Sequence, residues 1–189
     1  MLISDDYKQL NTALHEADPE YGNFAGHLGK SIARLCQNNG IGSALDYGCG
    51  KGALAPVLKA IGLDVAEYDP AIPGKDGEPC KAGLVVCIDV MEHVEPNCVD
   101  DVLQHIAGLA KSLAYFMIDN VPANKLLPDG RNAHLTIEDH AWWREKLSKY
   151  FDIKVYERAY KIEVQKKSQV SHLSGGVTVA VGIPKTDAT

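Results

Sequence analysis

Hydrophobic positions along the chain switch between helical and strand-like spacing. In residues 1–40, apolar side chains recur every three or four positions, which predicts two helical pieces broken near Pro19 and Gly22. After residue 40, apolar runs of strand length follow one another, and helical patterns separate most of them. This alternation predicts an α/β fold built on a parallel sheet. The expected strands cover residues 44–46, 63–69, 84–88, 114–118, 151–157 and 176–183.

The first expected strand leads into a glycine turn. Gly48, Gly50 and Gly52 follow Asp46 at alternate positions, and a helical pattern begins at about residue 53. Glycine takes positive φ at little cost and lets a ligand approach the backbone, while the start of a helix presents free N–H groups. The strand, the turn and the helix together predict a cofactor-binding site.

Two cofactors fit this turn. Gly48-x-Gly50-x-x-Ala53 matches the dinucleotide fingerprint, so an NAD oxidoreductase is one hypothesis. Asp46 argues against it, because a carboxylate there would repel a pyrophosphate and would suit an ammonium and a sulfonium. Asp69 ends the second expected strand, where it would reach the hydroxyls of a ribose.

This succession of strand-end acid, glycine turn and second acid resembles the first two motifs of class I S-adenosylmethionine (SAM)-dependent methyltransferases. The resemblance implies that Asp46 orients the methionine end of SAM and that Asp69 binds its ribose. The stretch LVVCIDVMEHVEP, residues 84–96, resembles the family's fourth motif, which borders the adenosine and the methyl group. The cofactor-binding residues expected from the resemblance are Asp46, Gly48, Cys49, Gly50, Gly52, Asp69, Pro70, Asp89, Val90 and Met91.

The chain also departs from the common fold of this family between its second and fourth expected strands. Only 14 residues lie between Asp69 and Leu84, which is too short for a crossover helix and a third strand. We therefore expect a Rossmann-like class I methyltransferase sheet that is reduced between strands 2 and 4 and ends in an antiparallel strand pair, the last strand lying beside the fifth. The family places an adenine-binding acid after the third strand. Asp76 or Glu78 could substitute, although a simple surface loop explains both.

The loop after residue 118 carries the densest group of reactive side chains. Residues 127–135 read LPDGRNAHL, with an acid, a guanidinium, an amide and an imidazole close together. A solvated Pro-Asp-Gly turn is one explanation. Because loops at the carboxyl ends of strands often carry function, we take His134 as the first candidate for a general base and Arg131 as the holder of an anionic acceptor group. His93 is the second candidate base, with a structural hydrogen bond to the backbone as the alternative.

Two helices are expected around this loop. One covers about residues 100–113, with Leu113 on its apolar face. The other is expected to begin at Thr136-x-x-Asp139, which resembles a capping box, and to continue to about residue 150.

Length and composition limit the possible functions. The 189 residues suit a single domain, which we divide into an N-terminal helical cap over 1–40 and a Rossmann-like core over 41–189. The net charge of −6 disfavours nucleic acid as a partner, although residues 161–172 form a locally basic connection. The five cysteines form no C-x-x-C pair and no Cys/His spacing suited to zinc, so no metal is predicted. Their odd number favours reduced thiols in the cytoplasm, and no apolar run reaches membrane-spanning length.

Together these features predict a SAM-dependent methyltransferase that transfers a methyl group by in-line displacement. A small molecule is the expected acceptor, because the sequence has neither the Asp/Asn-Pro-Pro-Tyr/Phe stretch of amino-methylating DNA enzymes nor a Pro-Cys nucleophile. Two alternatives stay open: a nucleic-acid or protein acceptor, and a SAM-binding module without catalysis. The sequence carries no signal for an oligomeric state.

Overall fold

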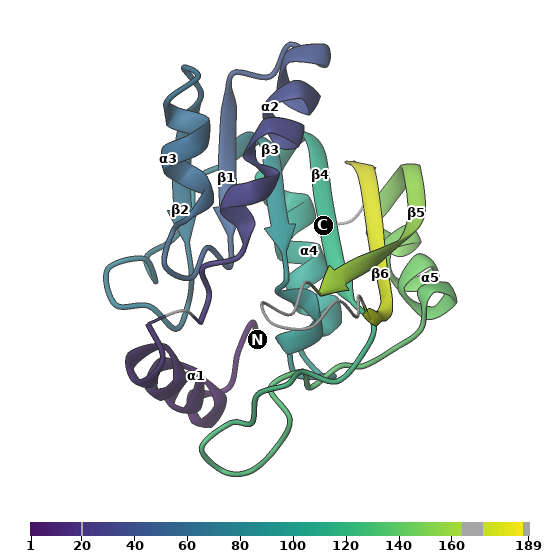
Figure 1. Cartoon of the computed structure of the whole chain (residues 1–189). Helices are drawn as coiled ribbons and strands as arrows, with labels where there is room; N and C mark the ends of the chain where they lie inside the picture. Colours follow the sequence, from purple (N-terminus) through teal and green to yellow (C-terminus); the bar gives the residue numbers. More distant parts are fainter. Residues whose placement is uncertain (20, 164–171, 187–189) are drawn as a thin grey trace.

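The computed structural model describes residues 1–19, 21–163 and 172–186. Its sheet has six strands in the order β2-β1-β3-β4-β6-β5 (Figure 1). Strands β2, β1, β3 and β4 run parallel, and β6 pairs antiparallel with both β4 and β5. The strands are β1 (Ser43–Tyr47), β2 (Asp64–Tyr68), β3 (Ala82–Ile88), β4 (Ala110–Asp119), β5 (Phe151–Glu163) and β6 (His172–Pro184). The expected Rossmann-like sheet and its antiparallel strand pair are confirmed.

Helices cover both faces of this sheet, which explains why β3 is apolar throughout. Leu84, Val86 and Ile88 face the layer of α2 and α3, whereas Val85 and Cys87 face the layer of α4 and α5. Successive side chains of a strand point to opposite faces, so one short apolar run fills two cores. These helices are α2 (Gly29–Asn38), α3 (Leu54–Lys59), α4 (Val99–Leu109) and α5 (His140–Tyr150).

The N-terminal segment forms the two predicted helical pieces, with the break at the expected place. Helix α1 spans Asp5–Ala17, and a 3₁₀ helix, η1, spans Ala25–Leu28 directly before α2. Figure 1 shows α1 beyond the carboxyl ends of β1, β2 and β3, apart from the helices that flank the sheet. Tyr7 is the one buried residue of α1. The helix therefore covers an edge of the sheet without contributing much to the core.

The segment between β2 and β3 forms a compact loop in place of a crossover helix and a third strand. Residues 69–81, all of which the structure describes, contain no strand. The N–H of Asp69 donates to the carbonyl of Lys75 at 2.9 Å, and the N–H of Lys75 donates to the carbonyl of Ile72 at 3.0 Å. The predicted reduction of the fold is confirmed, and β2 becomes an edge of the sheet.

Two predicted helix boundaries were wrong. Helix α4 ends at Leu109, and Leu113 lies in β4 opposite Leu84, because pairing with β3 overrides the helical spacing of the apolar residues. Helix α5 begins three residues later than expected. Its N-cap is Asp139, whose carboxylate accepts from the N–H of Trp142 at 2.8 Å, whereas the Thr136 hydroxyl donates to the carbonyl of Val94.

The last two strands pair along a greater length than the sequence predicted. Strands β5 and β6 are longer than the predicted 151–157 and 176–183. Lys166 and Lys167 of the expected basic connection lie outside the described residues. Each described helix is too short or too polar to cross a lipid bilayer.

Candidate active site

A cavity of about 470 Å³ lies at the carboxyl ends of the parallel strands, beneath α1. Each parallel strand delivers a lining residue at or directly after its last position: Gly48 from β1, Asp69 from β2, Asp89 from β3 and Asp119 from β4. This is the edge at which open α/β sheets bind ligands. Of the residues predicted for the site, the lining includes Gly48, Gly50, Asp69, Pro70, Asp89, Val90, His93 and His134.

The glycine turn has no room for side chains. Gly48 has a φ of 71°, and a Cβ there would lie 2.4 Å from the side chain of Val90. Gly50 has a φ of 50°, and a Cβ there would lie 2.6 Å from the carbonyl oxygen of Gly22. Both positions therefore require glycine for two reasons, backbone conformation and close approach. The second contact also shows that the segment after α1 rests directly on the turn.

Asp69 is fixed by two backbone N–H groups. Its Oδ2 accepts from Gly50 at 2.9 Å, and its Oδ1 accepts from Ala71 at 2.9 Å. The residue is 6% exposed and lines the cavity. Each carboxylate oxygen keeps further acceptor capacity, so the pair of oxygens can still accept from a diol while the backbone holds their orientation.

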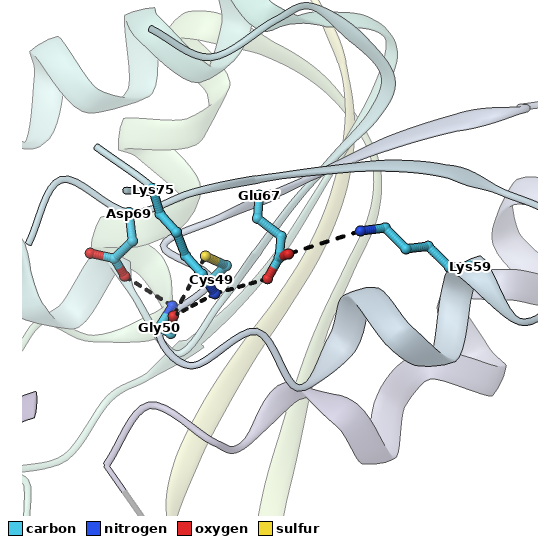
Figure 2. A network of polar contacts seen from close by, with 6 residues as sticks. All are labelled: Cys49, Gly50, Lys59, Glu67, Asp69 and Lys75. Carbon is cyan, nitrogen blue, oxygen red and sulfur yellow. Dashed lines mark hydrogen bonds and ion pairs between the residues drawn. The ribbon is translucent and has the colours of Figure 1, made fainter. Parts of the chain in front are cut away.

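A lysine of the shortened loop joins that loop to the glycine turn. Figure 2 shows the Lys75 ammonium donating to the carbonyl of Gly50 at 3.1 Å and to Oε1 of Glu67 at 2.9 Å. Lys59 reaches the other oxygen of Glu67 at 4.0 Å. Burial alone would lower the pKa of Lys75, but its hydrogen bond with Glu67 raises that pKa above the ordinary value. Lys75 stays charged and braces the turn; no motif in the sequence pointed to it.

Asp46 and Cys49 lie behind the cavity, outside its lining. Asp46 is 3% exposed, and its Oδ2 has no hydrogen-bond partner among the described residues. Burial, reinforced by the charge of Glu67, raises the pKa of Asp46 to about 7. Burial and then the carboxylate of Asp46 raise the pKa of the Cys49 thiol to about 12, so this thiol stays protonated. Gly52 and Met91 also lie outside the lining, and the cofactor roles of all four stay predictions.

Asp89 has an unusual backbone. Among the described residues it is the one non-glycine with a positive φ, at 60°. Its N–H donates to the carbonyl of Met117 at 2.9 Å, which holds this conformation at the end of β3. Strained positions of this kind cluster at functional sites, and Asp89 lines the cavity.

Two histidines stand together on the other side of the cavity. The rings of His93 and His134 meet edge to face with their centroids 4.7 Å apart. Nδ1 of His93 lies 2.8 Å from the carbonyl oxygen of Ala133, and Nδ1 of His134 lies 2.5 Å from that of Val121. A carbonyl accepts only, so each Nδ1 carries a proton and donates. The backbone hydrogen bond considered for His93 is present.

Arg131 is not among the residues that line the cavity. It is exposed, and its Nε donates to Oδ2 of Asp129 at 2.7 Å, within the Pro-Asp-Gly turn. Its role as an anion holder stays a prediction. Among the described residues, the lysine that lines the cavity is Lys125, which pairs with Asp18 at the end of α1 and lies 5.5 Å from the ring centre of Tyr21. Sequence reasoning missed Lys125, because only the folded loop brings it to α1.

Three buried side chains of the site have the composition of a metal site. Glu92, Asp119 and His134 each offer a ligand atom, and these atoms all lie within 4.8 Å of one another. Oε1 of Glu92 also accepts from the N–H of Asp119 at 2.7 Å, which ties the loops after β3 and β4 together. The sequence predicted no metal from cysteine spacing, and these three residues are too far apart in the chain to form a motif.

Comparisons with known proteins agree with this geometry. The model of the methyltransferase domain family matches residues 21–161. The fold resembles that of 1,6-didemethyltoxoflavin-N1-methyltransferase from Burkholderia thailandensis, with 14% identity, a TM-score of 0.64, and coverage of 95% of this chain and 89% of that one. That structure contains 1,6-didemethyltoxoflavin and S-adenosylhomocysteine (SAH).

Two further structures show the same fold. Magnesium protoporphyrin IX methyltransferase from Synechocystis PCC 6803, with bound SAH, has 16% identity and a TM-score of 0.57 over 87% of this chain and 86% of that one. The N-methyltransferase NodS from Bradyrhizobium japonicum, also with SAH, has 12% identity and a TM-score of 0.54 over 84% of this chain and 86% of that one. No curated protein sequence matches the chain. The family match covers most of the chain, which therefore belongs to the methyltransferase domain family and is a class I SAM-dependent methyltransferase.

Proposed function

We propose that this enzyme methylates a small-molecule acceptor held in the cavity beneath α1. The observation that carries the proposal is that one cavity joins the glycine turn and Asp69 to the histidine pair, His93 and His134. Its volume of about 470 Å³ lies within the range of about 300–1,000 Å³ that is typical of small-molecule sites. Helix α1 contributes Tyr7, Asn11 and His15 to the lining, so the N-terminal segment covers part of the cavity, which favours a small acceptor over a macromolecule.

The residues present fit SAM in three respects. Gly48 and Gly50 of the turn line the cavity with backbone, and Asp69 holds two oriented acceptors for the ribose hydroxyls. The buried Asp46 oxygen has no partner among the described residues; the ionised form of this side chain supplies negative potential behind the turn, and a cationic methionine end favours that form. When bound, SAM supplies a methyl group on a positively charged sulfur, from which an acceptor atom takes it by in-line displacement.

We assign the general base to His134. Its Nδ1 proton is engaged by the carbonyl of Val121, so Nε2 is the nitrogen that can take a proton from the acceptor. A positioned base contributes roughly 10²–10⁴-fold to such a step. His93, held by Ala133 and packed edge to face against His134, positions that ring. Orienting the two reactants can contribute on the order of 7–11 kcal/mol in the best intramolecular cases.

The organisation and location of the enzyme are part of the same proposal. Residues 1–40 and 41–189 act as cap and core of one domain, which is supported by the lining that both contribute to the cavity. The five cysteines are all free thiols, which supports a reducing compartment such as the cytoplasm.

The proposal is tested by following the methyl group. Purified enzyme is incubated with SAM labelled on its methyl group and with an extract separated into small molecules, nucleic acid and protein. We expect label to enter the small-molecule fraction. Label in either macromolecular fraction would contradict the proposed acceptor class, and no transfer to any fraction would favour a binding module without catalysis.

The same assay tests His134. We expect His134→Ala to lower transfer by roughly 10²–10⁴-fold while SAH affinity, measured by calorimetry, stays within a few-fold. His27→Ala is the matched control, because His27 is exposed and does not line the cavity. An equal loss of SAH affinity in His134→Ala would assign this residue to the cofactor pocket instead.

A further inference from the structure

One face of α1 carries polar side chains toward the cavity. Tyr7, Asn11 and His15 follow one another at intervals of four residues and therefore share a face of the helix. All three line the cavity. On a helix with a single buried residue, this is the face that meets the ligand space.

Three polar atoms on this face lack partners among the residues that the structure describes. The Tyr7 hydroxyl, Oδ1 of Asn11 and Nδ1 of His15 are buried, and none has a hydrogen-bond partner among the described residues. Buried polar groups in folded proteins are nearly always hydrogen-bonded, and leaving one unpaired is costly. Three such groups in a row on one helix face indicate that a ligand completes them.

The position of α1 indicates which part of the ligand would contact these three polar groups. The Thr12 hydroxyl donates to the carbonyl of Ala71 at 2.7 Å, two residues after Asp69. At the start of the helix, the Ser4 hydroxyl donates to Oε1 of Glu95 at 2.8 Å. Residues 7 and 11 therefore lie between the loop that holds the ribose carboxylate and the loop after β3. A base attached to a ribose at Asp69 would occupy this space.

The shortened loop offers no acid for that base. Asp76 is turned outward and pairs with Lys8 of α1 at 3.1 Å, and Glu78 is exposed. Neither residue lines the cavity. The structure therefore does not support Asp76 or Glu78 as a replacement for the family's adenine-binding acid. Another element must recognise the adenine.

We propose that Asn11, assisted by Tyr7, recognises the edge of the adenine of SAM in place of the missing third-strand contact. A carboxamide presents an acceptor beside a donor, which matches the amino group and N7 of adenine, and Asn forms such bidentate pairs with adenine. The Tyr7 hydroxyl can donate or accept beside it. Pro70 and Val90 supply apolar surface in the same lining. This inference rests on the proposed placement of the ribose at Asp69.

The test compares two ligands by calorimetry on the full chain. SAH carries the adenine amino group beside N7, whereas S-inosylhomocysteine carries a carbonyl oxygen there, so its edge presents two acceptors and a carboxamide can pair with only one of them. We expect the unmodified enzyme to bind SAH on the order of tenfold more tightly than the inosine analogue. Asn11→Ala should lose most of this preference, because its SAH affinity falls while its affinity for the analogue changes little.

Two further variants complete the test. Asn11→Asp keeps acceptor oxygens for the adenine amino group and should retain a preference for SAH. Asn38→Ala, at the end of α2 and exposed, should bind both ligands as the unmodified enzyme does. An unchanged preference in Asn11→Ala would overturn the inference. Failure of the unmodified enzyme to bind SAH would instead overturn the proposed cofactor site itself.

Discussion

Among single residues, Asp46 shows how burial changes the chemistry of the site. Its carboxyl group lies behind the glycine turn, where one oxygen has no partner among the described residues, and burial raises its pKa to about 7, against 3.8 for the free side chain. Between about pH 4 and about pH 7 the folded protein holds a proton on Asp46 that the unfolded chain has already released. Stability from this residue is therefore fully present below about pH 4 and is lost as pH rises through about 7.

This difference predicts the behaviour of Asp46→Asn. The variant cannot ionise at position 46, so its free energy of unfolding should not decrease in this way as pH rises. We expect the stability of the variant relative to the unmodified protein to rise by about 3 kcal/mol between about pH 5 and about pH 8, since one pKa unit corresponds to about 1.4 kcal/mol. Urea unfolding at both pH values measures this, and parallel stability curves would contradict the shifted pKa.

The residues predicted from sequence fall into two groups by distance along the chain. Gly48, Gly50 and Asp69 could be identified because one strand–turn–helix–strand unit places them together. Asn11 could not, because the direction of its helix face is set only when α1 lies over the sheet edge. Arg131 was expected to hold an anionic acceptor group, and in the structure its Nε donates to Asp129 of its own turn, whose Oδ1 also accepts the Arg131 N–H at 3.0 Å.

At the scale of elements, the loop between β2 and β3, which stands in place of a third strand, supports the glycine turn. Lys75 extends from this loop to the carbonyl of Gly50, so the glycine turn is braced by a side chain. The same ammonium neutralises Glu67, which is 25% exposed at its side chain. The sequence predicted that the strand is missing, because length limits topology; it could not predict the lysine, because a loop has no periodicity.

Lys75→Met tests this brace. The variant loses two hydrogen bonds from a partly buried ammonium, and we expect it to destabilise the fold by about 1–3 kcal/mol and to weaken SAH binding. Lys59→Met is the matched control, because Lys59 contacts the same Glu67 at 4.0 Å from a more exposed position. It should cost less than about 1 kcal/mol. Equal effects of the two variants in unfolding and calorimetry would show that Lys75 acts only through Glu67.

Element boundaries were harder to predict than element types. The strand beginning at Ala110 follows the helix ending at Leu109 directly, without a turn between them. The start of α5 is set by Asp139, because Thr136 is used by the loop after β3. In both cases a tertiary contact decides between local signals of similar strength.

For the whole molecule, α1 acts as a cover held at both ends by polar contacts. Ser4 bonds to Glu95 near its start, and Lys125 pairs with Asp18 at its end. Lys51 also donates to the carbonyl of Asp18 at 2.7 Å. These contacts hold α1 over the cavity, and we expect them to slow the release of a bound ligand.

Lys125→Met is expected to release one end of this cover. An exposed ion pair contributes at most about 1 kcal/mol, which corresponds to a rise of up to about fivefold in the dissociation rate of SAH. Stopped-flow displacement measures the rate, and added salt should raise it more in the unmodified enzyme than in the variant. Lys154→Met, which removes an exposed pair with Asp152 on β5, is the control. An unchanged rate in Lys125→Met would exclude a role for this pair in release.

The small buried surface of α1 has a consequence for finding the unknown acceptor. A helix that buries one side chain unfolds locally far more often than the sheet does, so its amide hydrogens exchange quickly with deuterium oxide. A compound that fills the cavity stabilises the closed helix and slows that exchange. Mass spectrometry of peptides from residues 5–17 could then rank candidate acceptors in the presence of SAH, where no turnover is possible. The helix would report occupancy before any product is known.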